Sequence, residues 1–326
     1  MLPNTAAFEV KPSEKFACFA FENIAVDNSL SAPLELGEGL WVLPHSPIRL
    51  DAQWQKWVGS IKSEKIGKSN LFLIAVKDSQ TPEILDHENQ WLQRRTNVLF
   101  YGLLLQGVPD HLEGWIFTGA RIAGEISIRS MGDLSNYYHS HPKARVIIRA
   151  GTCIAAKLFA DGYGKIEESA DYARVKRGMR AVVRGLKEPS VDDRIHEYVR
   201  ALEALIKPKI GATTKQFVHR CQTFALAGQD AREILEECYL IRNAVEHMHS
   251  SDETLSSYPK ARREAVAFRR LRQIEGLAFA VYLKLATSAT HAALFKTDSD
   301  IEAFWLKKDH ERCGLWGSTV DLAKIS

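Results

Sequence analysis

Helical periodicity dominates the second half of the chain and limits the folds that it can adopt. Between about residues 187 and 290, apolar residues recur every three or four positions, as they do on one face of an α-helix. The first of these segments begins after Ser190, which forms a capping box with Asp193, and the last is a long helix that Pro259 opens. Four helices with short connections predict an up-and-down bundle.

The N-terminal part of the chain, up to about residue 165, carries a different pattern. Runs rich in β-branched and aromatic residues, such as FACFAFENIAV and NLFLIAV, are separated by Gly, Pro and Asp and predict strands. Between them, HENQWLQRRTNVLFYGLLLQG predicts a helix that stops at Gly107. We therefore predict an α+β chain with a mixed α/β domain at residues 1–184, a four-helix domain at 185–296 and a C-terminal tail at 297–326.

The composition is that of a globular protein. Of 326 residues, 45% are hydrophobic and 25% are charged, which allows a sizeable core. No apolar run approaches the ~18 residues that span a bilayer, and the N-terminus does not resemble a secretory signal, so we predict no membrane association. Five cysteines without a CxxC pair indicate a reducing cytoplasm. His139 and His141 lack a third ligand in an ordered spacing, so we predict no metal and no cofactor.

Positive charge is concentrated in two runs, although a net charge of +3 argues against a chain that is polybasic throughout. Between Lys260 and Arg272 six basic residues accompany one acid, Glu264. Between Arg174 and Lys187 six basic residues occur without an acid. Each run is either a solvated face or a phosphate-contacting surface. In the second interpretation the candidate RNA-binding residues are Arg262, Arg263, Arg269, Arg270 and Arg272.

The residues best suited to catalysis lie in LIRNAVEHMHS, residues 240–250, at the predicted end of the third helix. One interpretation is a surface ion pair between Arg242 and Glu246, with His247 and His249 placed favourably in the helix dipole. The other is a catalytic group. At about 100° per residue, His249 lies about 20° from Arg242 around the helix, whereas His247 lies about 140° away. Helix geometry therefore favours His249 as the neighbour of Arg242.

These features together resemble the HEPN superfamily (higher eukaryotes and prokaryotes nucleotide-binding domain). RNAVEH is similar to its Arg-x(4–6)-His signature, and RIHEYVRALEAL and FVHRCQTFALAGQDAREILEECYLIRNAVEH are similar to its core helices. The resemblance is greatest to the bacterial Apea-like branch, in which a mixed N-terminal region precedes the bundle, and it covers roughly residues 185–290. It implies a helical domain that dimerises, so that two motifs face one cleft, and that cleaves RNA without a metal.

The resemblance also implies the chemistry of each residue. The RNA 2′-hydroxyl attacks the neighbouring phosphate and leaves a 2′,3′-cyclic phosphate and a 5′-hydroxyl. Arg242 would stabilise the phosphorane charge, and His247 would act as acid or base, which histidine can do at neutral pH. His249 would be a helper or substitute, and Asn243 would orient the phosphate or the histidine. Independently of the resemblance, the negative charge of Glu246, which lies between Arg242 and the two histidines in sequence, would raise the pKa of a histidine.

Two further features are placed at the same cleft by position alone. Arg194 and Glu203 on the first helix of the bundle are expected to line it. The apolar seam from Ile234 to Met248, which runs beside the Arg242 stripe, is expected to suit a dimer interface.

The sequence therefore predicts a cytoplasmic endoribonuclease that acts as a homodimer on RNA, in the manner of a growth-arrest toxin or a phage-defence effector, with an antitoxin or regulatory partner. The alternative is a non-catalytic HEPN module that dimerises or binds RNA. A third possibility makes the N-terminal domain the working part and the bundle its dimerising handle, but no catalytic spacing occurs there. We expect the N-terminal domain to regulate the nuclease or to select its RNA.

Overall fold

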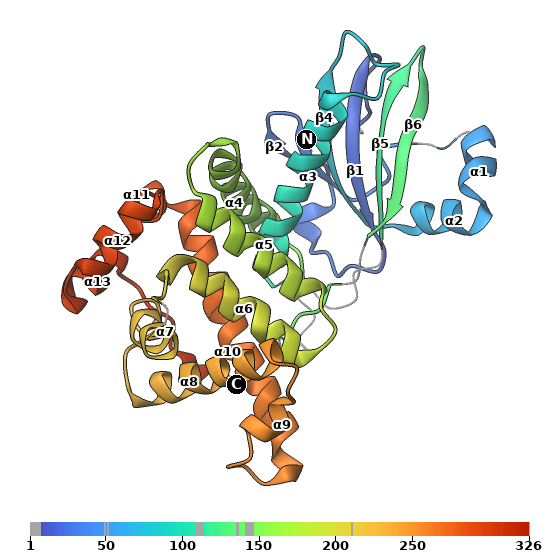
Figure 1. Cartoon of the computed structure of the whole chain (residues 1–326). Coiled ribbons are helices and arrows are strands. Elements are labelled where there is room, and N and C mark those ends of the chain that lie inside the picture. Colours follow the sequence, from blue (N-terminus) through green and yellow to red (C-terminus); the bar gives the residue numbers. More distant parts are fainter. Residues whose placement is uncertain are drawn as a thin grey trace. The chain divides into compact units, whose positions relative to one another are not determined.

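The computed structural model describes residues 8–48, 50, 52–107, 114–134, 137–140, 147–209 and 211–325. The chain divides into two compact units (Figure 1). Unit 1 comprises Met1–Tyr137 and Lys143–Ala160, and unit 2 comprises Tyr138–Pro142 and Asp161–Ser326. The predicted α+β class is confirmed, since a six-stranded antiparallel sheet is combined with a larger helical part. None of the described helices is long and apolar enough to cross a membrane.

The sheet of unit 1 has the strand order β2-β3-β4-β1-β5-β6, and every neighbouring pair in it is antiparallel. Its strands are β1 (Glu14–Phe21), β2 (Leu34–Gly37), β3 (Leu40–Leu43), β4 (Leu71–Asp78), β5 (Gly114–Ile122) and β6 (Glu125–Asp133). Its helices are η1 (Asn28–Leu30), α1 (Ala52–Val58), α2 (Ser60–Lys68) and α3 (His87–Leu105), and α4 (Ala150–Glu168) begins in it.

The central strand β1 is buried on both faces, because successive side chains alternate between two apolar layers. On one face, Phe16 belongs to a cluster that includes Val58 of α1 and Ile66 of α2. On the other face, Phe19 packs against Phe100 of α3 with 5.5 Å between the ring centroids. The sheet is therefore enclosed at its centre, and α3, which the sequence predicts, is the helix that covers the second face.

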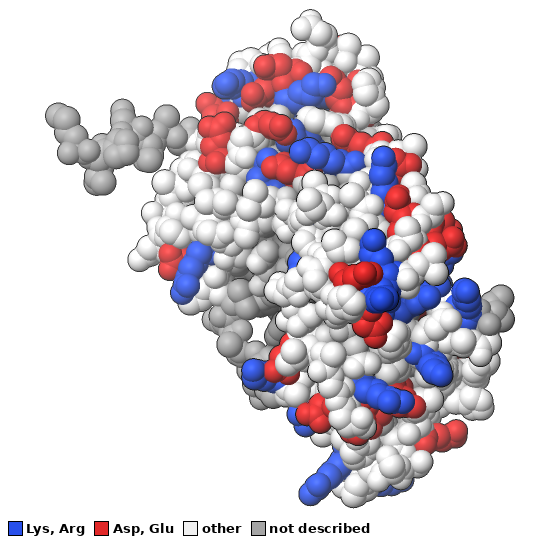
Figure 2. All heavy atoms as spheres, turned by 90° about the vertical axis from the view of Figure 1, so that its left-hand side faces the viewer, with Lys and Arg blue, Asp and Glu red and all other residues white. Residues whose placement is uncertain are grey.

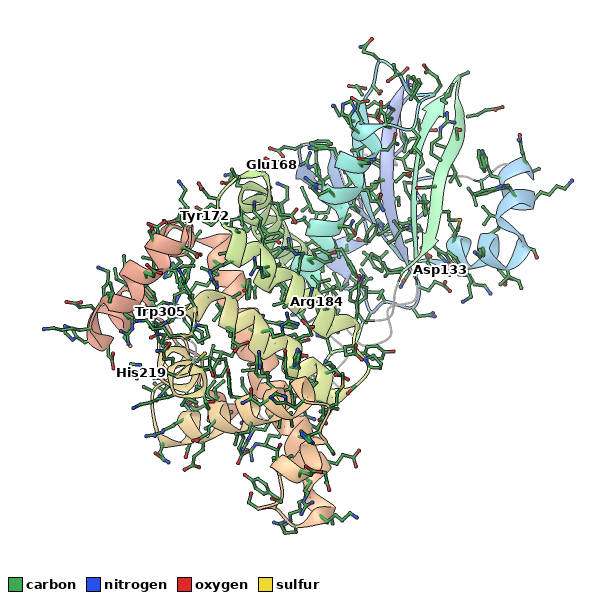
Figure 3. The ribbon with its side chains drawn as sticks, viewed as in Figure 1. Asp133, Glu168, Tyr172, Arg184, His219 and Trp305 are labelled. Carbon is green, nitrogen blue, oxygen red and sulfur yellow. The ribbon has the colours of Figure 1, made fainter. Side chains whose placement is uncertain are left out.

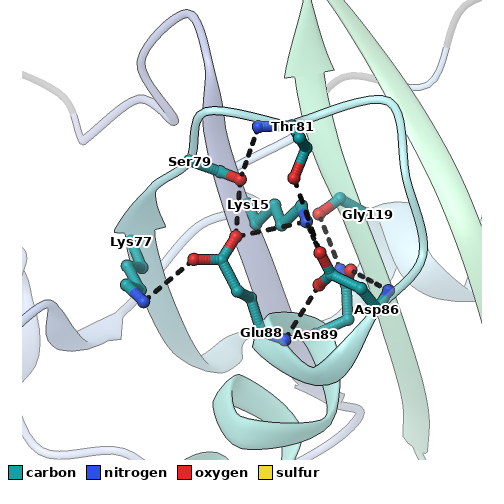
Figure 4. Close-up of polar contacts among 8 residues, drawn as sticks. All are labelled: Lys15, Lys77, Ser79, Thr81, Asp86, Glu88, Asn89 and Gly119. Carbon is teal, nitrogen blue, oxygen red and sulfur yellow. Dashed lines mark hydrogen bonds and ion pairs between the residues drawn. The ribbon is translucent and has the colours of Figure 1, made fainter.

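A buried ion cluster joins β1 to the start of α3 (Figure 4). The fully buried Nζ of Lys15 lies 2.9 Å from the Asp86 carboxylate, which caps α3, and 3.2 Å from that of Glu88. The Ser79 hydroxyl and then the Lys77 ammonium lower the pKa of Glu88 to about 2. Every charge in this cluster is paired, which is what allows a lysine to be buried in a sheet.

Unit 2 is helical. Its first long helices, α5 (Ala173–Lys187) and α6 (Val191–Ile206), pack side by side, and α6 also packs against α8 and α10 (Figure 1). Ser190 caps α6 as predicted, since its hydroxyl accepts from the Asp193 N–H. The remaining elements are α7 (Thr213–Cys221), α8 (Gln229–Glu246), α9 (Ser251–Thr254), α10 (Lys260–Thr287), α11 (Ala289–Ala293), α12 (Asp298–Leu306), α13 (Asp309–Trp316) and η2 (Leu322–Lys324).

The predicted limits of the helical domain differ at both ends from the division into two units. Helix α5 spans the predicted boundary at residue 185, yet all of it belongs to unit 2 because its apolar face packs on α6. The sequence predicts a tail at residues 297–326, but these residues hold two buried tryptophans. The Trp305 indole donates to the Leu205 carbonyl at 3.0 Å, and Trp316 packs 4.6 Å from the Phe224 ring. The C-terminal helices thus complete the core of unit 2.

Glycine 178 allows α5 to approach α6 closely. A Cβ there would lie 1.6 Å from the Tyr282 Oη and 2.9 Å from the Ala201 carbonyl oxygen, to which Tyr282 donates at 2.8 Å. We expect Gly178→Ala to lower the free energy of unfolding by about 1–3 kcal/mol, the usual cost of overpacking. At Gly164 on α4, in contrast, a Cβ would meet no neighbouring atom within 4 Å.

The matched control is therefore Gly164→Ala, which should raise stability by about 0.5–1 kcal/mol because alanine favours a helix. Thermal unfolding followed by circular dichroism measures both variants. Equal melting temperatures for the two variants would contradict the close contact at Gly178.

Candidate active site

The candidate site is built around the C-terminal end of α8. The helix ends at Glu246, and Met248 adopts a left-handed conformation with φ of 58°. The His249 N–H donates to the Ala244 carbonyl at 2.8 Å, and the Met248 N–H donates to the Val245 carbonyl at 3.0 Å. This pair of bonds is a Schellman motif, which stops a helix and turns the chain away from its axis.

This ending overturns the helical-wheel argument for His249. Because the helix stops at Glu246, His247 is the capping residue and His249 lies beyond the helix. His249 therefore does not continue the stripe of Arg242. Both imidazoles belong to exposed residues, and neither makes a side-chain hydrogen bond or ion pair with another residue that the structure describes.

Arg242 is held within unit 2 by two acidic side chains. Its Nη2 lies 3.1 Å from Glu203 Oε2 on α6, and its Nη1 lies 3.8 Å from Glu246 Oε2. The guanidinium also donates to the Asn243 side chain at 3.2 Å and lies 5.7 Å from the centre of the Tyr239 ring. The predicted neighbours Asn243, Glu246 and Glu203 are thus brought to Arg242.

The surroundings of Arg242 decide what it can bind. Its side chain is 19% exposed, and its Nε is buried without a hydrogen-bond partner among the described residues. The Tyr239 hydroxyl donates to Glu203 at 3.0 Å, and burial, followed by the nearby Glu203, raises the pKa of this hydroxyl. A phosphate that approaches Arg242 must therefore share or displace a carboxylate that already neutralises the guanidinium.

His196 on α6 is a member of this group that the sequence did not indicate. Its Nε2 lies 3.6 Å from Glu246 Oε2, and its Nδ1 is buried without a hydrogen-bond partner in the described part of the chain. His196 and Glu203 are seven residues apart and therefore share one face of α6. Helices α6 and α8 run antiparallel at this contact, so His196 faces Glu246 and Glu203 faces Arg242. The sequence signal that could have identified His196 was its place on the same face of α6 as Glu203.

Arg194 was expected to line the same cleft, but the structure buries it elsewhere. It is 4% exposed, its Nη2 lies 2.7 Å from Glu275 of α10, and it donates to the Tyr138 carbonyl at 2.6 Å. The apolar seam of α8 is likewise used internally. Ile234 is buried in unit 2, whereas Met248 at its end is 94% exposed. The seam as a whole is therefore core, and only its last residue is available to a partner.

The arginines of α10 have different surroundings from those predicted for an RNA-binding face. Arg270 is buried and paired with Glu237 at 2.6 Å, so its guanidinium is not presented to solvent. Arg263 is paired with Asp252 at 2.9 Å, and Arg272 is half-buried over the Phe268 ring. The two that remain on the surface are Arg262 and Arg269.

Charged side chains of both signs are visible on one face of the molecule (Figure 2). On the face shown in Figure 2, Lys and Arg side chains are interspersed with Asp and Glu. A depression of about 500 Å³ lies in unit 2 among the starts of α6, α9 and α10, with Leu255, Phe268, Arg263 and Asp192 in its lining. It does not include Arg242 or either exposed histidine.

The residues that the structure describes contain no group of three His, Cys, Asp or Glu side chains that could hold a metal ion. All five cysteines are free. Burial raises the pKa of Cys153 and Cys238 to about 12 and raises the pKa of Cys18 and Cys221 as well, so these thiols stay protonated at neutral pH.

Comparisons of the chain with protein-family models, with curated proteins and with solved structures found no significant match. Any functional assignment therefore depends on the residues of the chain itself.

Proposed function

We propose that unit 2 is a metal-independent endoribonuclease that acts as a homodimer, with Arg242 and His247 of each subunit at the scissile phosphate. The observation that carries the proposal is the end of α8. There, two exposed imidazoles follow a guanidinium within about two helical turns. Imidazoles can supply both the base for the 2′-hydroxyl and the acid for the leaving 5′-oxygen at neutral pH.

The proposal includes a fold assignment. Helices α6, α7, α8 and α10 would be the four core helices of a HEPN-like bundle of the Apea-like branch. What supports it is their order, the position of the Arg-x4-His motif at the end of the third helix, and the long helix that follows. Helix α5 and the C-terminal helices would be additions to that bundle.

A second subunit is part of the proposal because the HEPN resemblance implies that two Arg-x4-His motifs face one cleft. Leu240 is 43% exposed and Met248 is 94% exposed, and both flank the motif. Leu240, Asn243 and His247 are separated by three and four residues and therefore share the outward face of α8. Exposed apolar residues thus border the polar site residues on this face. We propose that two subunits contact each other symmetrically through it.

Glu203 and Glu246 would then have defined tasks. Each holds the guanidinium in place before RNA binds, and an incoming phosphate would take over one of its hydrogen-bond faces. Glu246 also faces His196, so it would link the arginine to a third imidazole. The proposed cellular role is RNA cleavage in the cytoplasm for growth arrest or phage defence, with a neutralising partner.

A non-catalytic RNA-binding or dimerisation module is the second candidate. The observation in its favour is the pairing of Arg242 with two carboxylates, which leaves little free charge for a transition state. The two candidates differ in whether a product forms.

The test is cleavage of single-stranded RNA in EDTA. The expected products carry a 2′,3′-cyclic phosphate and a 5′-hydroxyl, and an RNA with 2′-deoxyribose at the cleavage position should stay intact because it lacks the nucleophile. Sedimentation at the assay concentration should show a dimer. Binding of RNA without any product, or cleavage of the deoxy-substituted control, would contradict the nuclease proposal.

A further inference from the structure

Helix α5 carries a stripe of exposed basic side chains that the proposed catalytic group does not use. Arg177, Arg180, Arg184 and Lys187 are separated by three, four and three residues, so they project from one face of the helix. The opposite face is buried and includes Val175, Met179, Val182 and Leu186. At 1.5 Å per residue the stripe is about 15 Å long.

The structure separates Arg177 and Arg180 from Arg174 and Lys176 of the same run. Arg174 is paired with Asp298 at 2.7 Å, and Lys176 donates to the Ser169 carbonyl, so both stabilise the fold. Arg177 and Arg180, in contrast, make no side-chain hydrogen bond or ion pair with any residue that the structure describes. Two guanidinium groups on one face are therefore available for a ligand.

The stripe continues towards Arg242. Helix α6 lies between α5 and α8 (Figure 1). Arg184, which is labelled in Figure 3, pairs with Glu197 of α6 at 3.0 Å, and Glu197 lies 3.9 Å from the exposed Arg200. One turn further along α6, Glu203 binds Arg242. An extended polyanion on α5 would thus meet further positive charge on its way to the candidate active site.

We propose that the α5 stripe, formed by Arg177, Arg180, Arg184 and Lys187, together with Arg200, binds the sugar–phosphate backbone of single-stranded RNA and leads it to Arg242. The path of the RNA towards Arg242 rests on the proposed function, whereas the binding of RNA to the stripe does not. Arginine favours phosphate because its planar fork donates two hydrogen bonds to one phosphate group.

Other polyanions fit less well. A membrane-binding helix inserts its apolar face between lipids, but the apolar face of α5 is packed on α6. An acidic peptide would also pair with the cations, but it lacks the regularly charged backbone that would keep it on the stripe as far as Arg242. The stripe therefore fits a nucleic-acid strand best, and the other two partners become outcomes of the test.

The test variant is Arg177→Gln/Arg180→Gln, because both side chains lack partners within the described fold. The matched control is Lys215→Gln/Arg232→Gln, two exposed cations on α7 and α8 that remove the same charge. The probe is a fluorescent 2′-O-methylated oligoribonucleotide, which cannot be cleaved by its own 2′-oxygen. Anisotropy gives the dissociation constant between about 0.05 and 0.2 M salt.

For single strands, each lost phosphate contact makes the slope of log K against log salt less steep by about 0.7. The slope of the test variant, which loses two contacts, should therefore be less steep by about 1.4. If such contacts contribute nothing at 1 M salt, its affinity at 0.1 M falls by about 25-fold. The control should stay within about 5-fold, and both variants should keep the melting temperature of the parent protein.

The outcomes separate the two proposals. An unchanged slope and affinity in Arg177→Gln/Arg180→Gln, with cleavage of unmodified RNA intact, would overturn the stripe and leave the nuclease standing. A reduced slope in Arg177→Gln/Arg180→Gln would support the stripe. If the parent protein also fails to cleave RNA, the nuclease proposal would be overturned. Tighter stripe-dependent binding to polyglutamate or to anionic vesicles than to the oligoribonucleotide would overturn RNA as the ligand.

Discussion

Replacement of His247 by alanine should lower the rate of RNA cleavage by about 10²–10⁴-fold, the usual contribution of a positioned acid or base. The side chain of His247 is exposed and makes no hydrogen bond or ion pair with the described residues that its loss would break. Stability should therefore stay within about 0.5 kcal/mol of the parent protein. Initial rates in EDTA, measured with end-labelled RNA, check the prediction.

The other histidines give a graded comparison. His249→Ala should have a smaller effect, because the Schellman turn removes His249 from the stripe of Arg242. The matched control is His219→Ala, an exposed histidine of α7 whose ring lies 3.1 Å from Asp309 (Figure 3). Undiminished cleavage in both His247→Ala and His249→Ala would remove these two residues from the mechanism.

Loss of the arginine provides an independent measurement of the same site. Arg242→Ala should lower the cleavage rate by about 10²–10³-fold, as removal of one donor to a developing negative charge does. Glu203 and Glu246 would then lack their shared cation, so RNA affinity should fall as well. A rate equal to that of the parent protein would show that Arg242 only holds α6 and α8 together.

Replacement of Glu275 by alanine should lower the free energy of unfolding of unit 2 by about 3–5 kcal/mol, the usual cost of breaking a buried ion pair. Glu275 is 1% exposed and lies 2.7 Å from the Arg194 guanidinium. It also accepts from the Ser140 hydroxyl at 2.7 Å and from the Ser140 N–H at 3.1 Å. Its removal leaves Arg194 buried without an anion.

A second variant separates the contribution of the Glu275 charge to stability from that of its hydrogen bonds. Glu275→Gln keeps an acceptor for Ser140 but removes the charge, so its loss should be smaller than that of Glu275→Ala. Glu264→Ala, an exposed acid on the same helix, should change stability by less than about 0.5 kcal/mol. Hydrogen exchange of α6 and α10 localises the effect to unit 2. Similar exchange rates in Glu275→Ala and Glu264→Ala would contradict the proposed importance of the ion pair.

Helices α6, α7, α8 and α10 of unit 2 were predictable because local rules decide them. The apolar spacing of α6 and α8, the Ser190 cap and the Pro259 start of α10 are properties of neighbouring residues. Part of the candidate site was predictable as well. Asn243 and Glu246 reach Arg242 because they share its helix, and Glu203 reaches it from a position that the helical pattern of α6 had marked.

Other features were beyond local rules. Helix α8 ends at Glu246, and Met248 in the turn that follows has a left-handed backbone conformation. Because glycine usually occupies this position, the sequence carries no signal for the turn at Met248. A charged run shows how many cations it contains but not which are paired. Only the fold reveals that Arg174 is bound to Asp298 while Arg177 is exposed, and that Arg270 is buried against Glu237.

The sequence by itself determined the helical segments α6, α7, α8 and α10 and placed an arginine and two histidines near the end of α8, because backbone hydrogen bonding and apolar periodicity act over a few residues. Tertiary structure alone decided which partners those side chains meet. Burial and ion pairing join residues such as His196 and Glu246, which are far apart in the chain, and these contacts depend on how α6 packs against α8.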